Sequence, residues 1–429
     1  MKEVSLTNKT LKAVNTKDSL FFYGSVLLGV FIWFFFFFVT PIEVKNELSS
    51  FTTCFIILNY IALVFGFALP LFPLGVFEKS EWIKTNKLRV LETLITIVLI
   101  SFLFRYFDLF HNRNLSLWNS IKLNNDNAAN HFSIVFNLLS AFRVIYFIPL
   151  IYYYRGKIKK KRLLVLCFFL FLLPLIEGYL RGSRRIIFES LGFLFLILIL
   201  SKKINFTSLK TYVISLPIVI IFIGFSFFVV QSRTDFDSSN EFYKKIITSE
   251  YNDFVPPNRT ALRCFEESDN PFLKKALFTE IHVGQYIVHG VYEMDYMVSN
   301  HDNHTYGMFN FYLLIKFFNK LGITNIDLDN LKNPTGRNTY ITFFGGLYND
   351  FGWFSLIGMF CLGWLQKQLF TLRKRSYLVE PLIVVFLFSN IFLLIFNFFR
   401  ANLLLAIGVY LLFLINLKIF LKLRSTQSE

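Results

Sequence analysis

The stretch that decides the fold runs from Leu164 to Leu200 and reads LVLCFFLFLLPLIEGYL (164–180), RGSRR (181–185) and IIFESLGFLFLILIL (186–200). Two apolar runs enclose a connection that contains three arginines. Each run predicts a membrane-spanning helix, because about 20 apolar residues in a helix cross the hydrocarbon core of a bilayer. The second run has only 15 residues, so a spanning helix must also include residues that flank the run. This requirement places Arg184 and Arg185 near the membrane boundary.

The composition agrees with a polytopic membrane protein. The chain has 429 residues, of which 55% are hydrophobic and 19% aromatic, with 57 Phe, and its mean hydropathy is +0.52. These values exclude a soluble globular domain. In a membrane protein, the formal net charge of +16 belongs to the segments that flank the spans, so no nucleic-acid partner is expected.

The apolar runs predict ten membrane helices and therefore an all-α fold. Seven helices form an N-terminal bundle within residues 1–230, residues 231–350 make a large helical outer loop, and three helices form a C-terminal bundle within 351–429. The predicted spans are Leu20–Thr40, Phe51–Phe72, Val90–Phe110, Phe132–Tyr154, Leu163–Leu180, Ile186–Leu200, Thr211–Val230, Phe351–Phe370, Leu378–Phe396 and Leu403–Ile419.

The distribution of cations orients this topology. With the N-terminus inside, the inner segments carry 24 Lys and Arg residues and the short outer segments carry seven. This excess satisfies the positive-inside rule and predicts a multi-pass protein of the cytoplasmic (inner) membrane with both termini in the cytoplasm. Arg181, Arg184 and Arg185 form the one outer cluster that opposes the trend.

Two interpretations of this cluster follow from its surroundings. The arginines can snorkel to lipid headgroups while forming helical ion pairs with acidic residues four positions away. That ladder would contain Glu177, Arg181, Arg185 and Glu189. Alternatively, the guanidinium groups hold an anion such as a lipid diphosphate, whose oxygens match their fork of donors.

Other charges lie inside the predicted spans. Arg105 and Asp108 stand three apart in the third span and can neutralise each other on one helix face. Arg143 lies near the middle of the fourth span with no local carboxylate. It is therefore either the ion-pair partner of a distant acid or part of a cavity wall.

The outer loop contains two stretches of interest. Residues 272–299 have helical periodicity and place His282, His289 and Glu293 on one face, which is either structural or supplies a general base. Two histidines seven apart lack a metal-binding geometry, so no metal site is predicted. Tyr306–Leu321 is apolar but interrupted by polar residues, which indicates an interfacial or re-entrant helix at the outer leaflet, or a buried packing helix.

A resemblance appears before the eighth span. The stretches RNTYIT (337–342) and GGLYNDFGW (345–353), with the upstream GSR (182–184) that opens a helix, resemble the oligosaccharide repeat unit polymerases. These are the Wzy-type O-antigen and capsule polymerases of bacteria. The order of multiple spans, Gly-Ser-Arg turn, large outer loop and Asp-Phe-Gly stretch is similar as well.

The resemblance implies a membrane glycosyltransferase of polysaccharide biosynthesis, such as lipopolysaccharide or capsule synthesis, at the outer face of the cytoplasmic membrane. Members of the family transfer the growing glycan from its polyprenyl (undecaprenyl) diphosphate carrier onto the next lipid-linked repeat unit and release the diphosphate. The implied partners are the polyprenyl-diphosphate-linked oligosaccharide, membrane lipids, and a chain-length regulator and flippase of the same pathway. No cofactor is implied.

The chemistry selects candidate residues. Glycosyl transfer from a lipid diphosphate requires neutralisation of the leaving phosphate, a proton acceptor near the attacking hydroxyl, and exclusion of water. Outer cations meet the first requirement without a metal, and aromatic faces can stack on sugars. The candidates for substrate binding are Arg181, Arg184, Arg185, Arg337, Tyr340, Tyr348 and Arg400. The candidates for the proton acceptor are Asp350, His282 and His289.

Two other functions fit the same topology. An O-antigen ligase-type glycan transferase, which moves a finished glycan onto another acceptor, shares the span count and the outer loop. A flippase for lipid-linked oligosaccharides should show internal repeats and charges near the midplane of several helices. The sequence shows no duplication, and its polar content gathers in one outer loop, so the polymerase is the predicted function.

Overall fold

The computed structural model describes residues 16–69, 86–116, 118–130, 133–204, 224, 239–300, 303–332, 334–337, 339–373 and 376–425. Within these ranges the regular structure is helical, and a single isolated bridge pairs Ile42 with Pro257. The predicted all-α class is confirmed for this part of the chain.

Five helical segments are long and apolar enough to cross a membrane. They coincide with the first five predicted spans. Their elements are α1 (Thr16–Val39), α2 (Ser50–Ala68), α4 (Lys87–Phe107) with its π-helical extension Asp108–Asn112, the segment Ile134–Arg155, and α8 (Lys161–Leu180).

The other predicted spans have mixed outcomes. α9 (Arg184–Leu200) and α17 (Ser355–Leu372) are helical. Shorter apolar helices, Tyr377–Phe392 and Leu404–Leu417, overlap α18 (Glu380–Phe392) and α19 (Leu404–Ser425). The predicted span Thr211–Val230 lies outside the described residues. The total of ten spans therefore stays a prediction.

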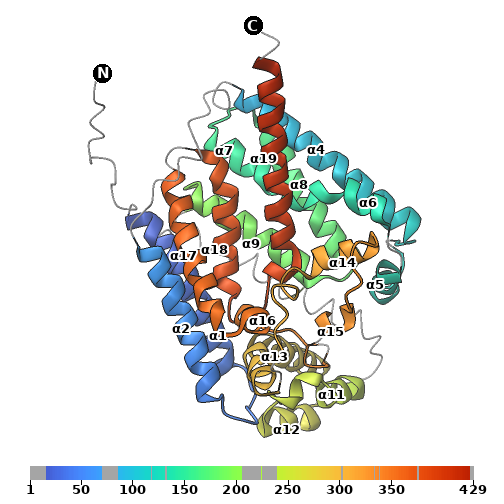
Figure 1. Ribbon diagram of the computed structural model, residues 1–429. Helices are drawn as coiled ribbons and strands as arrows, with labels where there is room; N and C mark the ends of the chain where they lie inside the picture. Colours follow the sequence, from blue (N-terminus) through green and yellow to red (C-terminus); the bar gives the residue numbers. More distant parts are fainter. Residues whose placement is uncertain are drawn as a thin grey trace.

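Figure 1 shows the long helices side by side in one bundle, with α1 beginning and α19 ending near the same end. Short helices of the outer loop gather at the opposite end. The helices at that end include α11 (Ser239–Ile247), α12 (Arg259–Glu267), α13 (Pro271–Asn300), α15 (Leu328–Lys332) and α16 (Phe343–Phe351). The orientation of this bundle in a membrane stays a prediction.

α13 attaches the outer loop to the bundle. Its Gly284 lies so close to the end of α1 that a Cβ atom there would come within 2.3 Å of the Thr40 side chain. Further along α13, Asp295 accepts the backbone N–H of Ser49 at 3.3 Å as well as its hydroxyl. Ser49 is also the N-cap of α2, so one loop helix contacts the outer ends of two membrane helices.

α2 and α17 approach each other through two glycines. A Cβ atom on Gly66 would lie 2.0 Å from the carbonyl oxygen of Phe360, and one on Gly363 would lie 1.9 Å from that of Leu63. Small residues at such crossings let helix backbones come close, which stabilises helix pairs where lipid supplies no hydrophobic driving force. The N-terminal and C-terminal parts of the chain therefore pack as one bundle.

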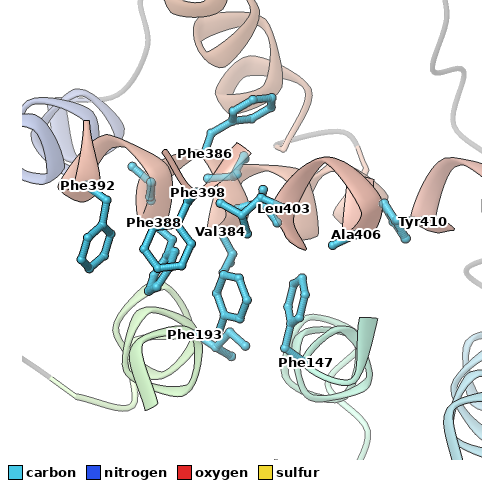
Figure 2. Packing of buried hydrophobic residues seen from close by; sticks show 14 of the residues in the cluster. Phe147, Phe193, Val384, Phe386, Phe388, Phe392, Phe398, Leu403, Ala406 and Tyr410 are labelled. Atoms are coloured by element: carbon cyan, nitrogen blue, oxygen red, sulfur yellow. The ribbon is translucent and has the colours of Figure 1, made fainter. Parts of the chain in front are cut away.

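Aromatic rings fill the core between α9, α18 and α7 (Ile148–Arg155), as Figure 2 shows. The Phe193 ring of α9 lies 4.4 Å from Phe147 and 4.7 Å from Phe388 of α18, centroid to centroid. All three rings are fully buried. This packing fixes the position of α9, and with it the arginines at its N-terminus.

The fourth predicted span is interrupted. It consists of α6 (Ile134–Leu139), a 3₁₀ segment (Ala141–Ile145) and α7. The carbonyl oxygen of Ser140 accepts both the backbone N–H of Arg143 at 3.2 Å and its Nη1 at 2.8 Å, so a side-chain donor adds to the backbone bond at the break.

The ninth predicted span ends earlier than expected. α18 stops at Phe392, and the prediction of a helix through Phe396 is wrong at this end. The reason is that the backbone beyond α18 bonds to the segment before α16. Phe343 donates its N–H to Leu393 at 3.1 Å, and Asn397 donates to Ile341 at 3.2 Å.

The predicted interfacial helix is present in part. Tyr306–Leu321 contains turns followed by α14 (Tyr312–Lys320), and none of the residues in α14 is buried. This exposure does not fit a buried packing helix. The predicted place of this helix at the outer leaflet stays a prediction.

The α2–α17 contact predicts a sharp difference between two glycines of one helix. Gly363→Ala should lower the free energy of unfolding by about 1–3 kcal/mol, because the added methyl group meets backbone atoms that cannot move independently. Gly358→Ala should have little effect, because nothing lies within 4 Å of a Cβ atom at that position. Thermal unfolding of the two purified variants in detergent measures the difference, and equal stability would contradict the close packing.

Candidate functional site

A tight turn joins α8 to α9. α8 ends at Leu180, Gly182 adopts a left-handed φ of +56°, and Ser183 donates its N–H to the carbonyl of Gly178 at 2.7 Å. Glycine is favoured at this position after a helix because it enters the left-handed region without strain. The chain therefore reverses direction within three residues, with arginines on both sides of the turn.

Arg181 closes α8. It is the C-cap residue and pairs with Glu177 at 3.2 Å across one helical turn, where the helix dipole also favours a cation. Because Arg185 belongs to α9, the predicted ladder does not continue. No ion pair joins Arg185 to Glu189 among the described residues, so the ladder is wrong beyond its first pair.

Arg184 and Arg185 open α9, where the dipole disfavours them. The positive end of the helix dipole lies at the N-terminus, and the first turn of α9 contains no acidic residue. Ser183, the N-cap residue, makes no side-chain capping bond. Two cations thus lie in the same helical turn as the first backbone N–H groups of α9, an arrangement that favours a bound anion.

The outer loop covers this helix end. Arg184 Nη2 lies 3.4 Å from His282 Nε2, and its guanidinium carbon is 6.0 Å from the ring centroid of Tyr286. In the described part of the chain, neither Arg184 nor Arg185 forms an ion pair with a carboxylate. We call Arg184, Arg185, His282 and Tyr286 the α9 site.

One face of α13 supplies the loop side of the site. His282, Tyr286, His289 and Glu293 follow each other at intervals of four, three and four residues and lie on the same side of the helix. The prediction that the two histidines and Glu293 share a face is confirmed. Within the described ranges, no three His, Cys, Asp or Glu side chains gather as metal ligands would.

His282 lies in a positive environment. Burial lowers the pKa of His282 to about 3, and Arg184 and Lys245 act in the same direction. The ring also borders a cavity of about 130 Å³ whose polar lining includes Lys245, Ser249 and Gln285. A neutral imidazole between two cations can accept a hydrogen bond.

His289 has a positioning role. Its Nδ1–H donates to the carbonyl oxygen of Gln285 at 2.8 Å, and its Nε2 accepts the backbone N–H of Tyr340 at 3.3 Å. Burial lowers the pKa of His289 to about 4. Both ring nitrogens are therefore occupied, and the residue attaches the segment of Tyr340 to α13 instead of facing a substrate.

Arg337 lies beside the same helix face but in a different group. Its guanidinium carbon is 4.5 Å from the ring centroid of Phe254 and 4.3 Å from that of Tyr296. It also lies 3.4 Å from Asp253 and 3.7 Å from Glu293. Two aromatic rings and two carboxylates thus engage this arginine.

Glu293, which the sequence placed with the two histidines on a face that is either structural or supplies a general base, is a buried carboxylate. Burial raises the pKa of Glu293, while Thr335, Thr339 and Arg337 act in the opposite direction. The signal in the sequence was its position four residues after His289, on the face that carries the histidines.

Asp350 belongs to a second polar group. Its buried carboxylate accepts the backbone N–H groups of Phe309 at 2.9 Å and Asn310 at 3.0 Å, together with the side chains of Asn310 and Thr305. Arg400 stacks on Phe309 at 3.8 Å and lies within electrostatic reach of Asp350. These contacts give the carboxylate a structural task, and no contact joins it to the α9 site in the described residues.

The two candidate tyrosines have different surroundings. Tyr340 is 46% exposed and its ring lies 5.3 Å from that of Tyr286, so it borders the α9 site. Tyr348 packs edge-on against Phe55 of α2 at 5.3 Å and belongs to another cluster.

Tyr251, whose ring lies 5.7 Å from that of His282, also borders the α9 site. It had no signal in the sequence because it lies in a separate short turn.

Comparisons with known protein families, curated proteins and solved structures find no match to this chain. The function is therefore argued from the residues and their geometry.

The buried histidines predict an acid-sensitive loop. Because the folded pKa of His289 is about 4 and an exposed histidine titrates near 6.5, the unfolded loop binds more protons between these values. Stability should fall as the pH falls from 6.5 to 4, by at most about 1.4 kcal/mol per pH unit for this residue. His289→Gln should flatten the profile, which limited proteolysis of the loop across this pH range would measure. An identical slope in both proteins would contradict the assignment.

Proposed function

We propose that the chain is an oligosaccharide repeat unit polymerase of the Wzy type. It acts as a membrane glycosyltransferase at the outer face of a bacterial cytoplasmic membrane and transfers the growing glycan from a polyprenyl diphosphate carrier onto the next lipid-linked repeat unit. The reaction class comes from the sequence resemblance at 337–342 and 345–353. The residues that would carry it come from the geometry of the α9 site.

The observation that carries the proposal is the position of Arg184 and Arg185 in the first turn of α9. Both cations oppose the helix dipole, and the described residues offer them no carboxylate. Such an arrangement costs free energy unless an anion binds. A diphosphate at the membrane boundary relieves this cost, because its oxygens accept the guanidinium donors and the N–H groups of the first turn.

The arrangement suits glycosyl transfer. In this reaction the bond between the anomeric carbon and the diphosphate oxygen breaks, and the diphosphate leaves with the bonding electron pair. The acceptor hydroxyl oxygen forms the new bond and its proton passes to a base. Negative charge increases on the departing diphosphate, so Arg184 and Arg185 interact more strongly with the transition state than with the bound donor.

His282 is the best-placed proton acceptor. Its ring contacts Arg184, so it would lie beside the diphosphate. In the free protein its lowered pKa makes it a weak base. A bound diphosphate brings negative charge and raises that pKa toward its ordinary value, so the base becomes effective only when the donor is present.

The surroundings assign separate places to phosphate and sugar. The cavity of about 130 Å³ beside His282 has room for a phosphate-sized group but not for an oligosaccharide. The half-exposed ring of Tyr340 lies on the Tyr286 side of the site. A sugar stacked on this ring would keep its anomeric carbon near Arg184.

Loss of one guanidinium group tests the proposal. Arg184→Ala should leave membrane insertion intact and abolish long-chain glycan in a strain that lacks the wild-type gene, because the leaving diphosphate loses a charge-assisted bond. The glycan ladder on a gel measures the outcome. Arg259→Ala is the matched control, since this exposed cation opens α12 on the same outer side, and it should preserve the ladder.

A normal ladder in the Arg184→Ala strain would defeat the anion-binding role. The null strain separates the other functions of the same topology. A single repeat unit on the final acceptor indicates a polymerase, whereas polymer that accumulates on its lipid carrier indicates a ligase. Repeat units that stay on the inner face of the membrane indicate a flippase.

A further inference from the structure

α14 exposes the apolar side chains that an amphipathic helix normally buries. Phe311, Leu314, Phe318 and Leu321 follow each other at intervals of three, four and three residues, so they lie along one side of the helix. Each of them is between 37% and 46% exposed. A stripe with this spacing faces the core in a helix at the surface of a soluble protein. We call these four residues the α14 stripe.

The chain itself covers a polar side of α14. The Asn319 amide donates to the carbonyl oxygen of Ile326 at 2.6 Å, and its side-chain oxygen accepts the N–H of Ile326 at 3.2 Å. The Thr324 hydroxyl donates to the same oxygen at 2.5 Å. Asn319 stands about 100° around the helix from Phe318. The segment after α14 thus folds back on a polar side and leaves the apolar stripe open.

A helix of the same length in the same loop has the ordinary arrangement. α12 and α14 each contain nine residues. α12 buries Ala261 and Phe265 and exposes Arg259, Arg263 and Glu267. This is the pattern that water imposes on an amphipathic helix. The contrast indicates that the medium beside the α14 stripe is apolar.

α14 is held firmly at the end of the bundle, so its exposed stripe is a fixed feature. Asp350 of α16 accepts the N–H of Asn310 at 3.0 Å, two residues before the helix begins. Arg400 lies 4.9 Å from the ring centroid of Tyr312. Arg400 belongs to the π-helical segment Phe399–Leu403 that leads into α19. These contacts attach the start of α14 to the start of a membrane helix.

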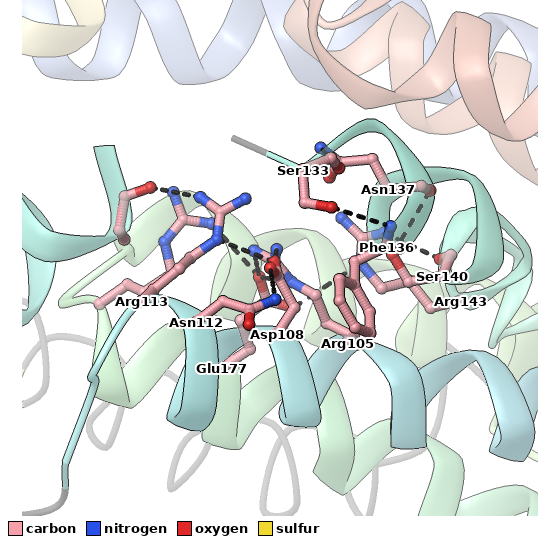
Figure 3. A network of polar contacts seen from close by, with 12 residues as sticks. Arg105, Asp108, Asn112, Arg113, Ser133, Phe136, Asn137, Ser140, Arg143 and Glu177 are labelled. Atoms are coloured by element: carbon pink, nitrogen blue, oxygen red, sulfur yellow. Dashed lines mark hydrogen bonds and ion pairs between the residues drawn. The ribbon is translucent and has the colours of Figure 1, made fainter. Parts of the chain in front are cut away.

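The membrane-spanning helices show what a lipid-facing surface looks like in this protein. In α4, Arg105 is buried and contacts Glu177 at 2.5 Å and Asp108 at 3.2 Å (Figure 3). The predicted Arg105–Asp108 pair is thus confirmed as part of a larger group. Leu103 and Phe107 of the same helix are exposed. Charged side chains lie inside and apolar ones outside, as expected where lipid surrounds a bundle.

The fourth span follows the same rule. Arg143 Nε lies 3.9 Å from Glu177 of α8, so the interpretation of Arg143 as the ion-pair partner of a distant acid is confirmed. Val135 and Leu138 of α6 are exposed. The α14 stripe therefore resembles the outward surface of the spans and differs from that of α12.

α19 connects the α14 stripe to this lipid-facing surface. Figure 1 shows α14 beside the start of α19, and α14 contacts the π-helical segment at that start. Leu411, Leu412 and Ile415 of α19 are exposed apolar residues. With nine residues α14 is about 14 Å long, which is too short to cross a bilayer. A helix of this length beside a span fits along the surface of the membrane.

We propose that α14 is a docking surface for membrane phospholipid. The α14 stripe enters the acyl chains of the leaflet at the end of the bundle at which α9 begins, and the segment that folds back on Asn319 faces water. Asp350 and Arg400 are positioning residues that hold the helix at this boundary. The inference does not depend on the proposed function, because it requires only membrane-spanning helices.

Quenching of a fluorescent label tests the environment of the stripe. An NBD group is attached to Phe318→Cys in the full chain, with one copy in each phosphatidylcholine nanodisc. The label should be quenched by doxyl-labelled phosphatidylcholine and protected from iodide in the water. Arg263→Cys on α12 is the matched control and should show the reverse. Alanine replaces the exposed native cysteines in both proteins: Cys54, Cys264 and Cys361.

A second position guards against a local effect of one substitution. Leu314→Cys should behave as Phe318→Cys does, because both residues belong to the α14 stripe. Iodide quenching at both positions as strong as at Arg263→Cys would overturn the docking surface. Protection from both quenchers at both positions would show that protein covers the stripe, which also overturns it.

Added undecaprenyl diphosphate distinguishes bulk phospholipid from a lipid substrate. Doxyl quenching at Phe318→Cys and Leu314→Cys should stay the same when this lipid is added to the nanodisc. A loss of quenching would show that the added polyprenyl chain occupies the stripe. That result would contradict a surface for membrane phospholipid.

Asp350→Asn tests how α14 is held. The variant loses the charge and one of the two oxygens that accept donors from the turn before α14. The label at Phe318→Cys should therefore lose part of its doxyl quenching and become accessible to iodide. Asp269→Asn, at an exposed loop carboxylate, is the control and should change neither. Unchanged quenching in Asp350→Asn would overturn the positioning role.

Discussion

A guanidinium group inside a bilayer needs an anionic partner, and this requirement governs how the helices of this bundle meet. At one end, Arg373 joins Asp18 of α1 to Glu380 of α18, and Arg155 also contacts Glu380. At the other end, Glu177 of α8 pairs with Arg105 of α4. Ion pairs thus connect helices that are distant in the sequence at both ends of the bundle.

The outer loop contacts the end of the bundle at which α9 begins. α13 contacts the ends of α1 and α2 through Gly284 and Asp295, and this fixes the helix face that carries His282 against the start of α9. His289 attaches the backbone of Tyr340 to the same face. The helix α9 thus contributes the cations, while the loop contributes an uncharged imidazole and the aromatic rings. A lipid diphosphate at the boundary would touch both parts.

Much of this arrangement was predictable because it depends on local sequence. The lengths of the apolar runs predict the membrane-spanning helices, and Gly182 predicts the turn between α8 and α9. The spacing of residues along α13 predicts which side chains share a helix face. The early end of α18 depends on a distant partner, the backbone of Phe343. Asp350 looked available for catalysis because its donors lie some 40 residues upstream.

The most direct test of the central claim is an experimental structure of the full chain in a lipid nanodisc with undecaprenyl diphosphate. The anion-binding account predicts phosphate oxygens within hydrogen-bonding distance of the Arg184 guanidinium and of the N–H groups in the first turn of α9. His282 should lie beside them. Diphosphate bound only at the inner end of the bundle, or Arg184 paired with a carboxylate in the ligand-bound protein, would contradict it.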